Sequence, residues 1–154
     1  MHTIEKLVGT IGIGRDFSNV SIQLGQTTVV DNVSVTIMFK GDGYDVTWET
    51  SSKSAIFKDC YDLNIGMVNW YGGPERQSQK WPIEKLNLSA DNAYVVNRYD
   101  NFAVAERYWL NSRGAYIFVE DTVPLFVDQN NEEQGKLCLI AKSKEPYIYK
   151  KKGN

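Results

Sequence analysis

The stretch VSVTIMFKGDGYDVTW, residues 33–48, alternates apolar and polar side chains on both sides of a glycine-rich turn. Every second residue from Val33 to Phe39 is apolar, and so is every second residue from Tyr44 to Trp48. Successive side chains of a strand point to opposite faces, so each half of the stretch presents one apolar face. Gly-Asp-Gly at residues 41–43 is typical of a hairpin turn. The stretch predicts two antiparallel strands.

The same period-two pattern recurs along the chain, between turn residues. We expect further strands at residues 20–25, 27–30, 56–63, 93–99, 104–110, 115–120, 125–127 and 137–141. Asp59 interrupts the apolar face of one of them. Because no segment shows sustained helical periodicity, the predicted fold class is all-β, an antiparallel β-sandwich. We expect one domain over residues 1–149 and a basic C-terminal tail over 150–154, with its lysines solvated.

Composition limits the classes of function. The 154 residues are 42% hydrophobic and 23% charged, which is typical of one globular domain. A net charge of -2 and a pI near 5.4 argue against a nucleic-acid partner, and the longest apolar run is too short to span a membrane. The only histidine is His2, so we predict neither a catalytic triad nor a metal site, and no cofactor motif is present.

Two features bear on the compartment of the protein. Cys60 and Cys138 form either a disulfide or two free thiols. Asn19, Asn32 and Asn87 each begin an N-glycosylation sequon, which matters only in the secretory pathway. The N-terminus lacks the pattern of a signal peptide, so both a secretory and a cytoplasmic location stay open.

An aromatic segment follows the predicted strand at residues 56–63. Residues 69–75 read NWYGGPE, and Trp81 comes soon after. Glycine accepts positive φ and proline lacks an N–H, so Gly-Gly-Pro predicts a break in regular structure and therefore a loop. A pyranose can lay its apolar face on an aromatic ring while amides and carboxylates bind its hydroxyls. The candidate ligand-binding residues are Trp70, Tyr71, Glu75, Arg76 and Trp81.

Two alternatives to this interpretation stay open. The tryptophans can instead be buried covers over one end of the sandwich. Glu75 is the best single candidate for an acid of a paired-carboxylate glycosidase, but the pattern places no second carboxylate beside it. We therefore interpret Glu75 as a hydrogen-bonding residue next to Arg76, and we predict no catalytic residue.

Several segments, in order, resemble the N-terminal β-sandwich of family 31 glycoside hydrolases, and the nearest group is the animal proteins typified by the myogenesis-regulating glycosidase. The matching segments are residues 59–61, 69–75, 79–84, 105–112, 123–128 and 137–139. The resemblance implies a galactose-mutarotase-like sandwich, which in that family precedes a (β/α)₈ barrel with both catalytic aspartates. No residue here matches those aspartates. The resemblance also implies a disulfide between Cys60 and Cys138 and a secreted or lumenal location.

Three functions follow from this resemblance as expectations. The first is a non-catalytic carbohydrate-binding sandwich that uses the aromatic segment. The second is a structural or self-assembling protein that uses the former barrel-docking surface, with another protein chain or a second copy as partner. The third is a fragment of a full-length retaining α-glycosidase.

Overall fold

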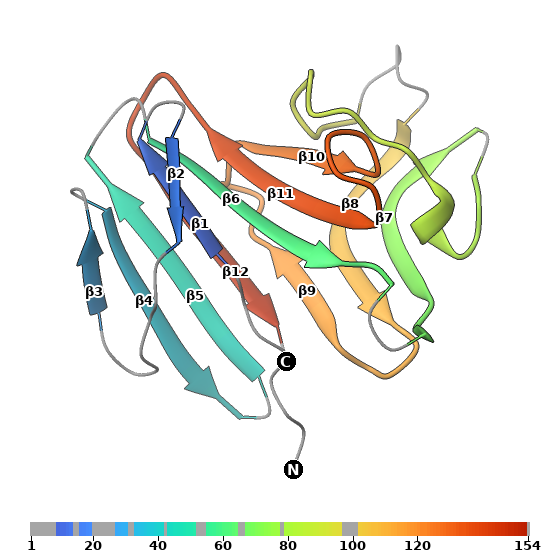
Figure 1. The fold of residues 1–154 in the computed structure, drawn as a ribbon, viewed down its shortest axis with the longest axis horizontal. Coiled ribbons are helices and arrows are strands. Elements are labelled where there is room, and N and C mark those ends of the chain that lie inside the picture. The colour runs from blue at the N-terminus through green and yellow to red at the C-terminus, as the bar shows by residue number, and fades with distance from the viewer. Residues whose placement is uncertain are drawn as a thin grey trace.

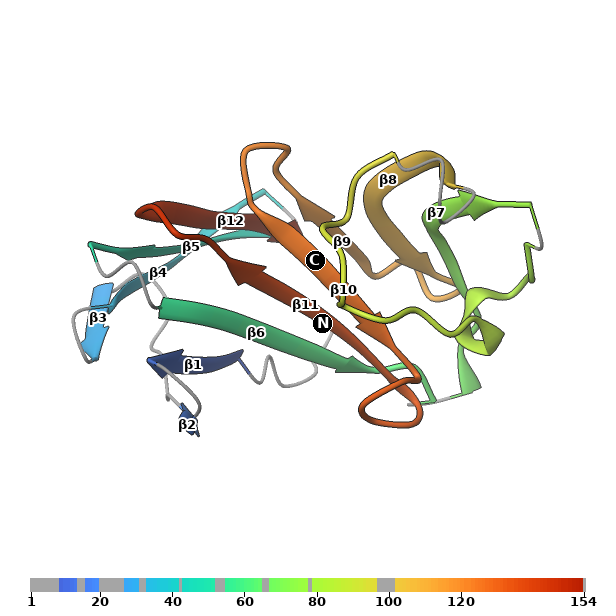
Figure 2. The same ribbon diagram turned by 90° about the horizontal axis from the view of Figure 1, so that it is seen from above.

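Two β-sheets packed face to face form the molecule in the computed structural model (Figures 1 and 2). The structure describes residues 9–13, 16–19, 27–30, 33–41, 43–51, 55–64, 67–77, 79–96 and 102–153. The five-stranded sheet has the order β10-β11-β6-β1-β2, and the seven-stranded sheet has the order β3-β4-β5-β12-β9-β8-β7. Neighbouring strands pair antiparallel. The predicted all-β sandwich is confirmed.

The strands of the described residues have the following bounds. They are β1 Gly9–Ile13, β2 Asp16–Asn19, β3 Thr27–Val30, β4 Val33–Lys40, β5 Gly43–Thr50, β6 Ala55–Asp62, β7 Trp70–Arg76, β8 Phe102–Asn111, β9 Tyr116–Val119, β10 Leu125–Gln129, β11 Lys136–Lys142 and β12 Tyr147–Gly153. One 3₁₀ helix, η2, covers Ile83–Lys85. The predicted hairpin is β4–β5, with Val33 opposite Thr50 and Lys40 opposite Gly43.

The core lies between the two sheets and is rich in aromatic rings. Trp48 of β5 and Tyr149 of β12 meet Phe57 of β6 across the interface, and none of the three is exposed to solvent. The centroid of the Trp48 ring lies 5.1 Å from that of Phe57 and 5.3 Å from that of Tyr149. Edge-to-face and tilted contacts at these distances add to the gain from burying apolar area. This cluster therefore joins the sheets.

Two predicted strands do not appear as expected. Residues 93–96 form no strand and bend at residues 94 and 95, because the segment is held by single contacts such as the hydrogen bond from Tyr94 N to Leu125 O (2.7 Å). Tyr94 is nevertheless buried, and its hydroxyl donates to Glu106 O (2.8 Å). Residues 97–99 and the predicted strand at 20–25 lie outside the described residues.

The prediction of a tail of solvated lysines at the C-terminus is wrong for Lys151, and residues 150–153 are part of a strand. These residues continue β12, which pairs with β5 on one side and β9 on the other. Alternation along this strand puts Tyr149 and Lys151 on the inner face, and Lys151 is only 1% exposed. The Lys151 ammonium forms an ion pair with Asp59 and donates to Tyr61 Oη (2.6 Å). Asp59, which interrupts the apolar face of β6, is the partner of this buried lysine.

The glycine-rich segment at residues 72–74 is also not a loop. It lies inside β7, the edge strand of the seven-stranded sheet, where the pairing with β8 shifts register between Gly72 and Pro74. Gly72 and Gly73 have φ of 90° and 74°. A bulge on an edge strand accepts residues with positive φ, and a proline there need not donate to a neighbouring strand. The predicted break is thus a β-bulge in a regular element.

This bulge gives a stability prediction. A Cβ at Gly72 would lie 2.2 Å from Tyr108 O, so Gly72→Ala must displace backbone. We expect the free energy of unfolding to fall by roughly 3 kcal/mol, from overpacking together with the cost of positive φ. Gly114→Ala is the matched control, because Gly114 has φ of 86° and no atom within 4 Å of the added Cβ. Urea denaturation should give a loss of about 1 kcal/mol there; equal losses would contradict the packing argument.

Candidate functional site

The candidate site lies where β7 and the segment leading into η2 meet. Tyr71 of β7 and Trp81 stack with ring centroids 6.0 Å apart and an interplanar angle of 24°. Tyr71 is 38% exposed and Trp81 is 54% exposed. Alternation along β7 sends Trp70 to the opposite face, where it is only 6% exposed. Of the three predicted rings, two therefore form an exposed pair, and Trp70 belongs to the core.

The backbone around this pair is held by specific hydrogen bonds. Trp70 N donates to the Glu84 carboxylate at Oε2 (3.0 Å), which ties β7 to η2. Arg76 N donates to Gln79 Oε1 (2.9 Å), which closes the turn between β7 and Trp81. Trp81 precedes Pro82 through a cis peptide bond. The Tyr71–Trp81 pair is thus carried by a strand and a braced turn rather than by an open loop.

The two predicted polar residues lie on the same strand. Glu75 is exposed and Arg76 is half-buried. Arg76 Nη1 donates to Asn87 O (3.2 Å), so its guanidinium is used in part to hold the segment after η2. Glu75 is available to a hydroxylated ligand as a hydrogen-bond acceptor.

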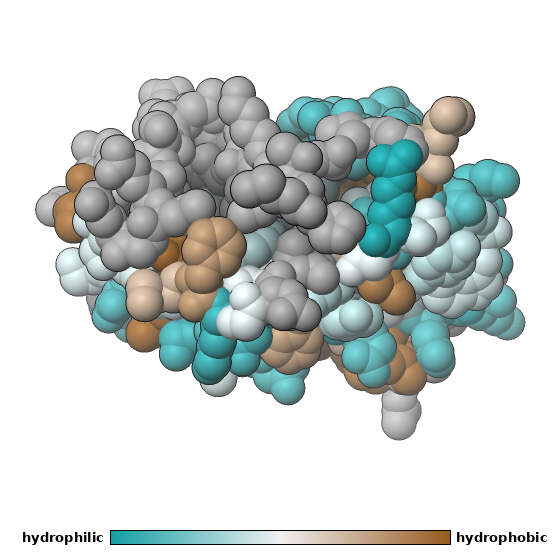
Figure 3. Space-filling model, turned by 90° about the horizontal axis from the view of Figure 1, so that it is seen from below, coloured by the Kyte–Doolittle hydropathy of each residue, from teal (hydrophilic) through white to brown (hydrophobic). Residues whose placement is uncertain are grey.

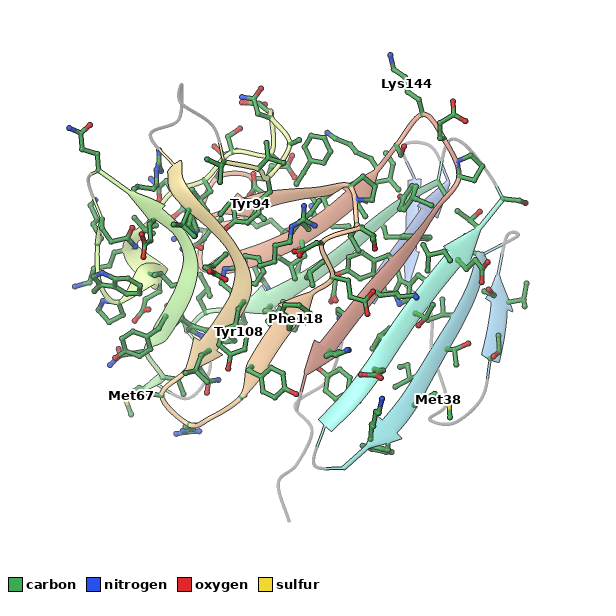
Figure 4. All side chains as sticks on the ribbon, turned by 180° about the vertical axis from the view of Figure 1, so that it is seen from behind. Met38, Met67, Tyr94, Tyr108, Phe118 and Lys144 are labelled. Carbon is green, nitrogen blue, oxygen red and sulfur yellow. A yellow bond between two sulfur atoms is a disulfide. The ribbon has the colours of Figure 1, made fainter. Side chains whose placement is uncertain are left out.

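The outer face of β8 and β9 is a second aromatic surface that the sequence analysis missed. Tyr108 lies directly opposite Phe118 and stacks on Tyr116 at 5.8 Å between centroids (Figure 4). Tyr108 is 38% exposed. The molecule seen from below, in Figure 3, differs from this aromatic surface. The residues coloured there form small hydrophobic areas separated by hydrophilic ones. The period-two phase of residues 104–110 could have indicated Tyr108, because it alternates with the buried Trp109.

A disulfide joins two neighbouring strands of the five-stranded sheet. Cys60 of β6 and Cys138 of β11 are bonded and lie directly opposite each other in the ladder, as the resemblance implied.

Within the described residues no helix has the length and apolar character needed to cross a bilayer.

Comparison with solved structures defines the class of the fold. The chain aligns with a GH31 family sulfoquinovosidase from E. rectale, solved in complex with an aza-sugar inhibitor, with a TM-score of 0.51 and 12% identity. The alignment covers 97% of this chain and 28% of that one. At this identity the likeness shows the fold alone, which is the β-sandwich found in a GH31 enzyme.

Sequence comparison then gives the family. The profile described as myogenesis-regulating glycosidase N-terminal domain matches residues 8–148, and the chain belongs to this family. It is 33% identical over 96 residues to the myogenesis-regulating glycosidase of Mus musculus, covering 59% of this chain and 13% of that protein. It is also 33% identical over 102 residues to the SITS-binding protein of Tetronarce californica, covering 62% and 14%. The matches thus span about one seventh of each relative.

Proposed function

We propose that this chain is a non-catalytic sandwich that binds carbohydrate at the edge formed by β7 and the turn before η2. The observation that carries the proposal is the exposed Tyr71–Trp81 pair. Large rings with this much exposed surface have a free energy to gain from covering it, and the C–H face of a sugar is a flat apolar partner. Glu75, exposed on the same strand, supplies an acceptor for hydroxyl groups.

The family supports sugar chemistry without placing catalysis in this chain. The matched profile is an N-terminal domain, and one relative is named a glycosidase. In the described residues the fold is a sandwich of strands with one short helix. Turnover of an aryl α-glycoside by the purified chain would contradict a non-catalytic role and would favour the fragment of a retaining α-glycosidase.

The binding prediction concerns Trp81. We expect galactose- or glucose-containing oligosaccharides to change the tryptophan fluorescence, and Trp81→Ala to weaken their binding about tenfold, since one lost ring contact is worth roughly 1.4 kcal/mol. Tyr71→Ala should have a similar effect. Affinities are measured by titration calorimetry, so that the loss of a fluorophore does not confuse the comparison.

Phe39→Ala is the matched control for these two variants. Phe39 is 56% exposed, close to the 54% of Trp81, but it lies on β4, which four strands separate from β7 in the seven-stranded sheet. We expect it to leave sugar affinity unchanged. Equal binding by the parent and Trp81→Ala, or equal losses in all three variants, would contradict an edge site at Tyr71 and Trp81.

A second candidate function is self-association through the outer face of β8 and β9. The observation that favours it is the cluster of Tyr108, Tyr116 and Phe118, whose rings stand together on one face. Covering such a cluster with a second copy would bury apolar area that is now partly exposed. Light scattering should then give a dimer that Tyr108→Arg dissociates. A strictly monomeric particle at high concentration would exclude this function.

A further inference from the structure

Asn87 is the exposed residue of a short extended segment that follows η2. Leu86 and Leu88 on either side are buried, with 4% and 6% of their surfaces exposed, while Asn87 is exposed. Leu86 has an extended backbone, with φ −80° and ψ 146°. Side chains alternate between faces in an extended chain, so anchoring the two leucines turns Asn87 outward.

The backbone at this position is fixed by its neighbours. Leu88 N donates to Gln129 O (2.9 Å), and Gln129 N donates to Leu88 O (2.9 Å). Arg76 Nη1 donates to Asn87 O (3.2 Å). The carbonyl of Asn87 is therefore used by the fold, whereas its exposed carboxamide takes part in none of these hydrogen bonds. A group attached to the side-chain nitrogen would break none of these hydrogen bonds.

A shallow polar depression of about 450 Å³ lies beside Asn87. Its lining residues are Asn64, Glu84, Lys85, Asn87, Asn130, Gln134 and Gly135. Carboxamides both donate and accept hydrogen bonds, and those of Asn64 and Gln134 suit the hydroxyl and acetamide groups of an N-acetylhexosamine. The Asn130 carboxamide is used by the fold, since its Nδ2 donates to Glu84 O and Leu86 O. The depression is thus large enough and polar enough to receive the first sugars of a chain attached at Asn87.

We propose that Asn87 carries an N-linked glycan whose first sugars lie in this depression. Asn87-Leu88-Ser89 supplies the sequon, and Ser89 is also exposed. The disulfide between Cys60 and Cys138 is an independent sign of the oxidising compartment in which such glycans are added. The side chains of the other two sequon asparagines, Asn19 and Asn32, lie outside the described residues.

The transfer is a balanced substitution. Nδ2 of Asn87 attacks C1 of an oligosaccharide linked to a polyprenyl diphosphate, the co-reactant that a host oligosaccharyltransferase uses. The bond from Nδ2 to C1 forms, and the bond from C1 to the phosphate oxygen breaks. The polyprenyl diphosphate leaves with that electron pair. Nδ2 releases one proton, and nothing is oxidised or reduced.

The test is mass spectrometry of the chain secreted from animal cells behind a cleavable leader. Release by peptide N-glycosidase F in ¹⁸O-water should convert Asn87 to labelled aspartate in most molecules. With Asn19→Gln and Asn32→Gln in place, one glycan should remain; Asn87→Gln should remove it, and Ser89→Thr should keep it. An unmodified Asn87 peptide in secreted, disulfide-bonded protein would overturn the proposal, and this readout needs no variant to fold.

A second measurement tests whether the first sugar lies in the depression. Trimming the glycan to its first N-acetylglucosamine should leave the melting temperature unchanged, whereas complete release should lower it by about 2 °C or more. An equal melting temperature for the trimmed and fully released proteins would show that the sugar does not contact the depression, and would overturn that part of the proposal.

Discussion

Asp59→Asn is expected to lower the free energy of unfolding by about 3–5 kcal/mol, because it leaves the Lys151 ammonium buried without its counter-charge. Asp59 is 1% exposed on β6, and Lys151 is 1% exposed on β12, so the pair bridges the two sheets. The hydroxyl of Tyr61 donates to Asp59 Oδ2 (2.9 Å) and accepts from Lys151 Nζ. Urea denaturation at pH 7 measures the loss.

The neighbouring lysine is the matched control. Lys152 points to the opposite face of β12, where its ammonium lies 3.9 Å from Glu120 Oε1 and its side chain is 45% exposed. Lys152→Met should change stability by less than about 1 kcal/mol, as solvent screens the pair. The double variant Asp59→Leu with Lys151→Met should recover most of the lost stability, since two apolar side chains need no partner. An Asp59→Asn protein as stable as the parent would contradict the pairing.

The pH dependence of the Asp59→Asn variant has a defined sign. Burial lowers the pKa of Lys151 below its ordinary value. Between that lowered pKa and the pKa of the unfolded chain, the unfolded state binds more protons, so stability rises with pH. Losing the Asp59 counter-charge lowers the pKa of Lys151 further in the folded variant than in the parent, so the stability of the variant rises more steeply with pH and its deficit should shrink from pH 7 toward 10. A deficit that stays constant or grows over this range would contradict this further lowering.

Removing the disulfide is expected to cost about 4 kcal/mol, because the cross-link restricts the unfolded chain over a sequence separation of 78 residues. The Cys60→Ser, Cys138→Ser double variant and the reduced parent should show the same loss relative to the oxidised parent in urea. Agreement between these two forms separates loss of the cross-link from the effect of the substitutions. Equal stability of oxidised and reduced parent would contradict the prediction.

Much of the scaffold could be predicted from period-two alternation. The β4–β5 hairpin, the strands near residues 104–110 and 115–120, and the strand at 137–141 appear close to their expected positions. Such segments have one apolar face that only a sheet can bury. The prediction failed at residues 93–96, where Tyr94 is buried by isolated contacts rather than by a ladder. A single buried ring does not produce a period-two pattern of apolar and polar residues.

The candidate site could be predicted only in part. Residue type pointed to Trp70, Tyr71 and Trp81, but the face on which each ring lies depends on strand phase. The sequence did not show the strand phase of residues 70–76, because Gly-Gly-Pro suits either a loop or a bulge on an edge strand. The register with β8 decided between them and put Trp70 inside.

The sequence by itself determined the strand pattern, the family resemblance and the pair of cysteines, because these depend on local alternation and on the order of short motifs. Only the tertiary structure decided that Lys151 is buried and that Tyr71 and Trp81 stack. Lysine is usually exposed to solvent. Lys151 is buried because β12 pairs with β5 on one side and β9 on the other, and because Asp59 supplies a counter-charge across the core. The physical reason is that charge pairing and ring stacking join residues that are separated in sequence. The local pattern of apolar and polar residues does not indicate which residues become partners.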